Sequence, residues 1–134
     1  GRRDWAGSNG TQTSALVYGG TNDPPSYALT ESWNGSSWTE VADLNVATIS
    51  GAGAGADNTS ALQFGGNTGS PVAKTELWNG SSWAETTDLS TARRNLAGTG
   101  TQASALAFGG SPDTASTEEW TGPGVPVVKT ITTD

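Results

Sequence analysis

The side chains best placed to bind a ligand lie in three short segments that differ from one another. Their Pro, Gly, Asn and Asp residues predict surface loops, and loops on a rigid scaffold are where binding residues usually lie. Tyr27 follows two prolines, where an aromatic ring can stack on a sugar or on a partner surface. The alternative is a plain connection in which these residues serve only the turn. The candidate binding residues are Asp23, Pro24, Pro25, Tyr27, Asn67 and Asp113.

Two arginine pairs, Arg2-Arg3 and Arg93-Arg94, suggest a second kind of site. Guanidinium groups bind carboxylates and sulfates through two parallel hydrogen bonds, so each pair could hold an anion. The alternative is a structural arginine that bonds neighbouring carbonyl groups or glutamates. The sequence leaves both interpretations open.

Catalytic side chains are scarce. The chain has no Cys and no His, which excludes thiolate nucleophiles, cysteine zinc sites and imidazole bases. Asp57 and Asn58 lack the ligand spacing of a calcium loop. Asp43 and Asp88 occupy equivalent places in a repeat, which favours turn caps over a catalytic pair. We therefore predict that the protein is not an enzyme and has neither a metal site nor a cofactor.

The charge of the chain restricts its partners. The net charge is −7 and the sequence pI is about 4.3. Such a surface repels phosphate backbones and anionic lipids, so we expect no nucleic-acid partner. Apolar runs end after four or five residues, whereas a membrane-spanning helix needs roughly 20, so no membrane insertion is expected.

The candidate segments recur at a regular spacing, which indicates the elements that must position them. The phrase Trp-Asn-Gly-Ser-Ser-Trp occupies residues 33–38 and 78–83, and a degraded version occupies residues 120–125. A diglycine keeps step with it, at intervals of about 45 residues. The residues that define the repeat are Gly19, Gly20, Trp33, Trp38, Gly65, Gly66, Trp78, Trp83, Gly109, Gly110 and Trp120. A period of this length is typical of a repeat array.

Each repeat unit reads as four short strands. An apolar pair with period-2 spacing precedes every diglycine: Leu16 and Tyr18, Leu62 and Phe64, and Leu106 and Phe108. Such spacing places both side chains on one face of a strand. The Asn-Gly steps predict hairpin loops that pair the two tryptophans. The first strand of each unit is rich in Gly and Ala, at roughly residues 5–11, 49–56 and 95–101.

Four antiparallel strands at this period predict a blade of a β-propeller, with the small residues near its axis. We therefore expect an all-β fold and a single domain over residues 1–134. The predicted blades cover about residues 2–46, 47–91 and 92–133. The β-branched segment 125–133 is expected to supply the last strand of the third blade, with a reach to a partner as the alternative.

These features resemble the kelch-repeat family. That family has a diglycine at the end of the second strand, an aromatic residue in the third and a Trp opening the fourth, as here at Trp33 and Trp38. The second unit lacks the usual arginine of the first strand, and the third has Val125 in place of the last Trp. The resemblance covers the chain to about Val125 and implies a propeller. It leaves the function open, because one fold serves many tasks.

The number of blades implies a partner. Propellers have four to eight blades, and three units leave two apolar faces bare. Covering a few hundred Å² on each face is worth on the order of 10 kcal/mol at ~25 cal/mol/Å². We expect a homodimer with six blades. Further blades from a longer chain, or three chains with nine blades, are the alternatives.

The expected function is a non-catalytic module with a structural, adhesion or recognition role. The Gly/Ser/Thr-rich sequence also resembles kelch-like repeats of phage tail-associated and bacterial surface proteins. This second likeness implies a virion or extracellular location and a glycan or surface-protein ligand. One alternative is a sialidase-like propeller enzyme, which would need a free tyrosine; of Tyr18 and Tyr27, the core pattern claims Tyr18. The other alternative is an excised propeller fragment that self-assembles.

Overall fold

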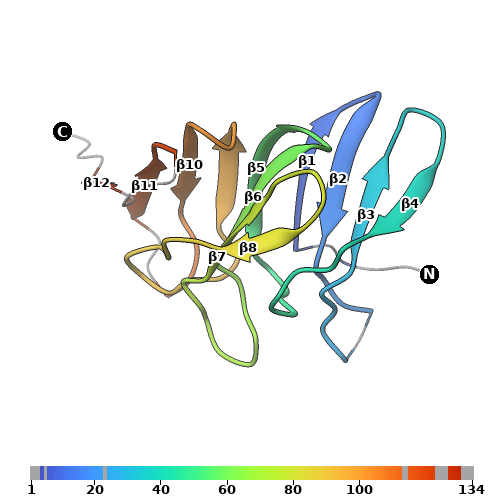
Figure 1. Ribbon diagram of the computed structural model, residues 1–134. Coiled ribbons are helices and arrows are strands. Elements are labelled where there is room, and N and C mark those ends of the chain that lie inside the picture. The colour runs from blue at the N-terminus through green and yellow to red at the C-terminus, as the bar shows by residue number, and fades with distance from the viewer. Residues whose placement is uncertain (1–3, 5, 23, 113–114, 123–126, 131–134) are drawn as a thin grey trace.

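The computed structural model describes residues 4, 6–22, 24–112 and 115–122, and the backbone of residues 127–130. Within these residues the chain forms twelve strands and no helix, and hence no helix that could cross a membrane. The strands form three antiparallel sheets of four, each with its strands in chain order (Figure 1). The predicted all-β class and the four-stranded unit are confirmed.

Each sheet corresponds to one predicted repeat unit. The first sheet contains β1 (Gly7–Thr11), β2 (Ser14–Tyr18), β3 (Thr30–Trp33) and β4 (Trp38–Val41). The second contains β5 (Ala52–Asp57), β6 (Ser60–Phe64), β7 (Thr75–Trp78) and β8 (Trp83–Glu85). The third contains β9 (Ala97–Gly100), β10 (Ala105–Phe108), β11 (Ser116–Trp120) and β12 (Val127–Thr130). Because β12 pairs with β11, the C-terminal segment takes the fourth place in its own sheet, as expected.

The sheets follow one another along the molecule, and their first strands β1, β5 and β9 adjoin (Figure 1). Glycine permits this close approach. A Cβ atom on Gly53 would lie 1.9 Å from Tyr18 Oη, and one on Gly98 would lie 2.4 Å from Phe64 Cζ. The small residues of the first strands therefore leave room for an aromatic ring of the preceding sheet.

The Trp-Asn-Gly-Ser-Ser-Trp phrase forms the predicted hairpin. The Asn34 side-chain oxygen accepts hydrogen bonds from the next two serine amides, each 2.9 Å long. Gly35 has a φ of +94°, a conformation that favours glycine. Trp33 and Trp38 then lie opposite each other on β3 and β4, with ring centroids 5.3 Å apart. Residues 78–83 repeat this arrangement in the second sheet.

An apolar core lies at each junction between sheets. The core between the first and second sheets contains Leu16, Tyr18, Leu44, Ala61, Trp78 and Trp83. The core between the second and third contains Ala52, Ala54, Leu62, Phe64, Leu89, Leu96, Ala105, Ala107 and Trp120. At both junctions an apolar pair from the second strand of one sheet meets Ala and Trp of the next sheet. The two junctions therefore have the same chemistry.

Candidate functional site

The loops that follow the diglycines in the first two sheets, residues 19–29 and 65–74, lie at the same end of the molecule, the lower edge in Figure 1. The other candidate loop, residues 109–115, is described only in part. Asp23 and Asp113 lie outside the described residues. The candidate residues that can be assessed are therefore Pro24, Pro25, Tyr27 and Asn67.

The first loop holds Tyr27 in a defined position. The Tyr27 hydroxyl donates a hydrogen bond of 3.0 Å to Asn22 Oδ1, and its amide donates one of 2.8 Å to Gly20 O. Pro24 and Pro25 are exposed, and Tyr27 is half-buried. The loop thus presents a fixed aromatic ring beside two exposed prolines. Such a surface can stack on a sugar ring or pack against an apolar group of a protein.

The second loop uses its candidate residue differently. Asn67 exchanges two backbone hydrogen bonds with Ile49, of 2.8 and 3.1 Å, and its side-chain oxygen accepts a 3.2 Å bond from the Gly69 amide. The Asn67 side chain therefore shapes its own turn. This arrangement fits the plain-connection interpretation, so the ligand-binding potential lies chiefly in the loop of Tyr27.

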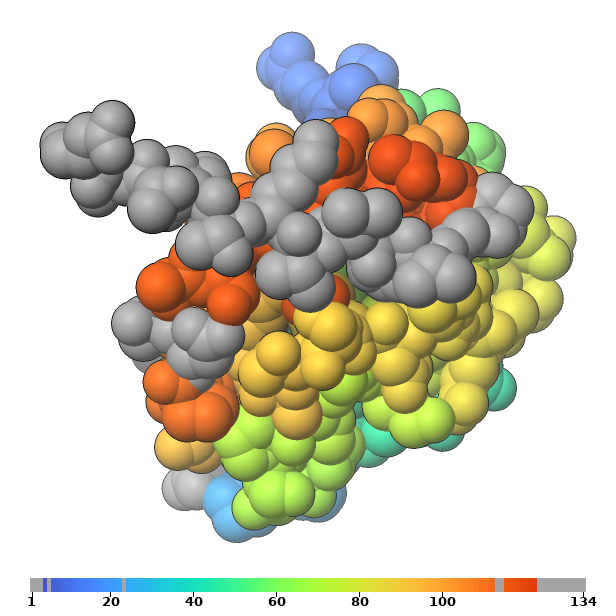
Figure 2. Space-filling view, turned by 90° about the vertical axis from the view of Figure 1, so that its left-hand side faces the viewer, coloured from blue at the N-terminus to red at the C-terminus, as the bar shows by residue number. Residues whose placement is uncertain are grey.

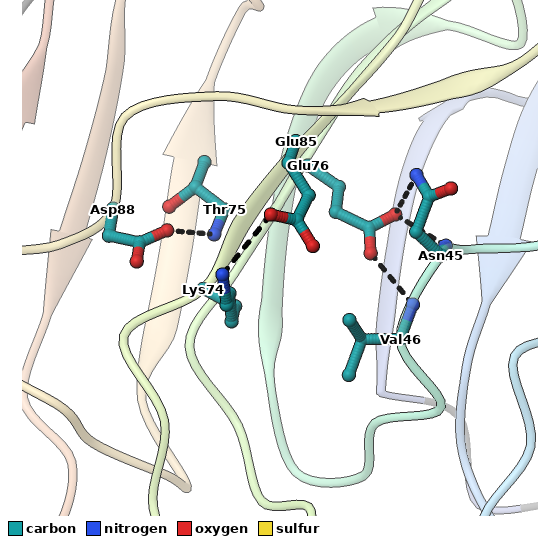
Figure 3. A network of polar contacts seen from close by, with 7 residues as sticks. All are labelled: Asn45, Val46, Lys74, Thr75, Glu76, Glu85 and Asp88. Atoms are coloured by element: carbon teal, nitrogen blue, oxygen red, sulfur yellow. Dashed lines mark hydrogen bonds and ion pairs between the residues drawn. The ribbon is translucent and has the colours of Figure 1, made fainter.

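A buried carboxylate fastens the second sheet to the connection that precedes it (Figure 3). Glu76 accepts hydrogen bonds of 2.9 Å from the amides of Asn45 and Val46, and is 1% exposed. Burial raises the pKa of Glu76 above its usual value, and the hydrogen bonds from Asn45 and Val46 oppose that rise. The Glu76 carboxylate binds backbone amides of the connecting segment, which fits a structural role.

An ion pair occupies the equivalent place in the third sheet. Arg93 Nη2 lies 2.5 Å from Glu118 Oε2, and Arg93 Nη1 donates to the carbonyls of Gly109 and Ser116. Both charged side chains are at most 1% exposed. Of the two interpretations given for the arginine pairs, Arg93 therefore fits the structural one. It has no room to bind a free anion. Arg2 and Arg3 lie outside the described residues.

Two further charged contacts of this region join segments that are separated in the sequence. Asp88 Oδ1 accepts a 3.3 Å hydrogen bond from the amide of Thr75 at the start of β7 (Figure 3). Lys74 and Glu85 form an exposed ion pair at 3.1 Å, and bonding to Glu85 raises the pKa of Lys74. Within the described residues, no three carboxylates cluster in a way that could hold a metal ion.

The exposure of the tryptophans differs from sheet to sheet. Trp78, Trp83 and Trp120 are buried, as core packing predicts, whereas Trp33 is half-buried and Trp38 is 48% exposed. The two groups have the same repeat positions, so the difference comes from what lies beside each sheet. Among the residues that the structure describes, no other sheet packs on the outer side of the first sheet (Figure 1).

The end of the molecule that belongs to the third sheet faces the viewer in Figure 2, where the described residues of that sheet are orange to red. Leu106 and Phe108 are 38% and 39% exposed, whereas the equivalent Leu62 and Phe64 are 0% and 3% exposed. We define the third-sheet face as Ala97, Thr99, Leu106 and Phe108, which are all exposed. We define the first-sheet face as Ala15, Val17, Trp33 and Trp38, which are all exposed or half-buried. The described residues thus form two open, largely apolar faces, one at each end of the row of sheets.

A polar groove of about 160 Å³ runs along the first strands. Its lining residues are Ser8, Asn9, Gly53, Ala54, Gly55, Gly98, Thr99 and Gly100. Asn9 Nδ2 crosses to the second sheet, where it donates a 2.7 Å hydrogen bond to Asp57 O. The groove marks the line on which the three sheets converge.

Comparison with known proteins found no matching family model and no similar curated protein.

Proposed function

We propose that this chain is a kelch-type propeller module whose three sheets are blades, and that it serves recognition or structure without catalysis. The convergence of β1, β5 and β9 on one polar groove is the observation that carries this proposal. Blades of a propeller meet at their first strands around a central channel, and small residues there permit the crowding. The repeated junction chemistry of the two apolar cores supports the same arrangement.

The recognition surface in this proposal is the loop that carries Tyr27. Its ring is fixed by the hydroxyl bond to Asn22 and by the backbone bond to Gly20, so binding would freeze little additional motion. The exposed prolines Pro24 and Pro25 extend the apolar surface beside it. The ligand class is a glycan or a protein of a cell surface, and the location is a virion appendage or an extracellular surface.

A glycan array tests the recognition role. We expect wild-type protein to bind, Tyr27→Ala to lose binding by about tenfold or more, and Trp33→Phe to retain it. Trp33 is a matched aromatic control because it lies at the end of β3 far from this loop, where its indole donates to Gln12 O at 2.9 Å. Silence of the wild type across all glycans would leave the architectural role, and equal losses in both variants would contradict the loop assignment.

The proposed propeller is completed to six blades by a second copy of the chain. Light scattering should then give a mass near twice that of the 13.5 kDa chain. A single folded monomer at all concentrations would contradict this completion.

A further inference from the structure

The two junctions inside the chain show what kind of surface covers each open face. At the first junction, Tyr18 packs edge-on against Trp83, with ring centroids 4.8 Å apart. At the second, Phe64 lies in one core with Ala105, Ala107 and Trp120. An aromatic residue of one second strand thus always meets the Ala and Trp face of the following sheet. The third-sheet face offers such an aromatic residue, and the first-sheet face offers the matching alanine and tryptophans.

At each junction a side-chain amide donates hydrogen bonds to the preceding sheet. Asn58 Nδ2 donates a 3.1 Å hydrogen bond to Trp33 O of the preceding sheet. At the next junction Gln102 Nε2 donates to the carbonyls of Ala61 and Trp78. Both amide residues also accept, through their backbone carbonyls, the indole N–H of the tryptophan in their own sheet. These residues therefore occupy one repeat position with one function.

Gln12 is the equivalent amide residue of the first sheet, which no other described sheet precedes. Gln12 O accepts the Trp33 indole N–H at 2.9 Å, which places Gln12 in the position of Asn58 and Gln102. Gln12 is exposed. By equivalence with Gln102, a preceding sheet would offer its amide the carbonyls of that sheet's second and third strands. In the third sheet those carbonyls belong to Ala105 and Trp120.

The diglycines indicate that the outer side of the third sheet is also uncovered. A Cβ atom on Gly19 would lie 2.6 Å from Thr48 O, and one on Gly65 would lie 2.8 Å from Arg93 O, so both glycines pack against the segment leading into the next sheet. A Cβ atom on Gly109 would meet no atom of the described residues within 4 Å. The diglycine of the third sheet is therefore equivalent to those of the first two sheets, but no described segment packs against it.

From these contacts we infer that the third-sheet face of one copy binds the first-sheet face of a second copy. This inference rests on the proposed propeller and assigns its completing surfaces. Phe108 packs on Trp38 of the second copy as Tyr18 packs on Trp83. Gln12 of the second copy donates to the carbonyls of Ala105 and Trp120. The reciprocal contact closes a ring of six sheets, because unlike faces that meet head to tail form a closed ring when the rotation permits.

One residue makes this contact looser than the junctions inside the chain. Ser8 stands where the second and third sheets have Gly53 and Gly98, as the pairing of these three residues with the second strands shows. At Gly98 a Cβ atom would lie 2.4 Å from the Phe64 ring. Ser8 supplies that atom, so Phe108 must seat slightly further out. Ser8→Gly should tighten the association by about tenfold.

Sedimentation equilibrium over a range of concentrations tests the inference. We expect the wild type to be a dimer, and Phe108→Glu and Trp38→Glu each to raise the dissociation constant by at least about 100-fold. Both residues are already exposed, so each variant should keep the far-ultraviolet circular dichroism of the wild type. Thr39→Glu is the matched control, because Thr39 is an exposed neighbour of Trp38 on β4 and points to the other side of the sheet.

Mixing the two variants distinguishes head-to-tail binding from pairing of like faces. The Trp38→Glu copy keeps its third-sheet face and the Phe108→Glu copy keeps its first-sheet face, so an equimolar mixture should form a one-to-one dimer. If like faces paired, only one of the two variants would lose association, and mixing would restore nothing. That result would overturn the inference, as would open chains of many copies.

A wild type that stays monomeric at all concentrations would also overturn it, and would leave further sheets of a longer chain as the cover for both faces. The recognition role would survive that outcome if glycan binding still depended on Tyr27.

Discussion

The second sheet and the two outer sheets have nearly the same sequence pattern but different surroundings. Trp78 and Trp83 of the second sheet are 1% and 5% exposed, whereas Trp38 of the first sheet is 48% exposed. Phe64 is 3% exposed and Phe108 of the third sheet is 39% exposed. Burial here depends on the position of a unit in the row rather than on its residues. Among the described residues, only the second sheet packs against another sheet on both sides.

The largest expected difference between the sheets concerns their equivalent phenylalanines. Phe64→Ala should lower the free energy of unfolding by about 4 kcal/mol, because it empties a buried site. Phe108→Ala should cost less than about 1 kcal/mol in the monomer, since its ring is already partly in water. Urea unfolding of both variants measures the difference, at a concentration where each sediments as a monomer. Equal losses would show that the third-sheet face is covered within the chain.

A smaller difference is expected between two glycines. Gly98→Ala should lower the free energy of unfolding by about 2 kcal/mol, because the new Cβ would lie 2.4 Å from the Phe64 ring and 2.9 Å from Gly53 O. Gly109→Ala should cost only about 1 kcal/mol, from the positive φ of 73° alone. Thermal unfolding under monomeric conditions measures both. A larger loss at Gly109 would mean that a neighbour already packs against it.

Much of the fold was predictable because it depends on local patterns. The Asn-Gly step of residues 34–35 determines a hairpin, and the period-2 pair of Leu62 and Phe64 marks one face of a strand. The exposure of Trp38 was not predictable from its phrase, which is identical to that of the buried Trp83, but only from the number of units, which leaves the two outer faces bare. What differs is the presence of a preceding sheet, which no local pattern records.

The candidate site was predictable only in part. The loop of Tyr27 was found from its composition, but the bond that fixes its ring to Asn22 depends on the loop conformation. The pairing of Arg93 with Glu118 joins residues 25 positions apart in sequence. Arg93 has Thr48 as its equivalent in the second unit, and this departure from the repeat was the one signal that could have marked a special contact.

The smallest expected effect separates two carboxylates of the second sheet, the buried Glu76 of β7 and the half-buried Asp57 at the end of β5. Burial raises the pKa of Glu76, so its proton binds the folded state more tightly than the unfolded state. Its contribution to stability therefore increases as pH falls through the folded pKa towards 4.5. Asp57 behaves oppositely, since the Thr59 hydroxyl bond lowers its pKa below 3.8. Its contribution is present above pH 3.8 and is lost as pH falls through the folded pKa.

Unfolding of Glu76→Gln and Asp57→Asn between pH 7 and pH 3 checks these signs against the wild type. The deficit of Glu76→Gln should grow as pH falls, because only the wild type gains from protonation at that site. The deficit of Asp57→Asn should shrink below pH 3.8, where the wild-type carboxylate begins to lose its advantage. The same trend in both variants would mean that the Glu76 carboxylate is as open to water as the Asp57 carboxylate of the same sheet.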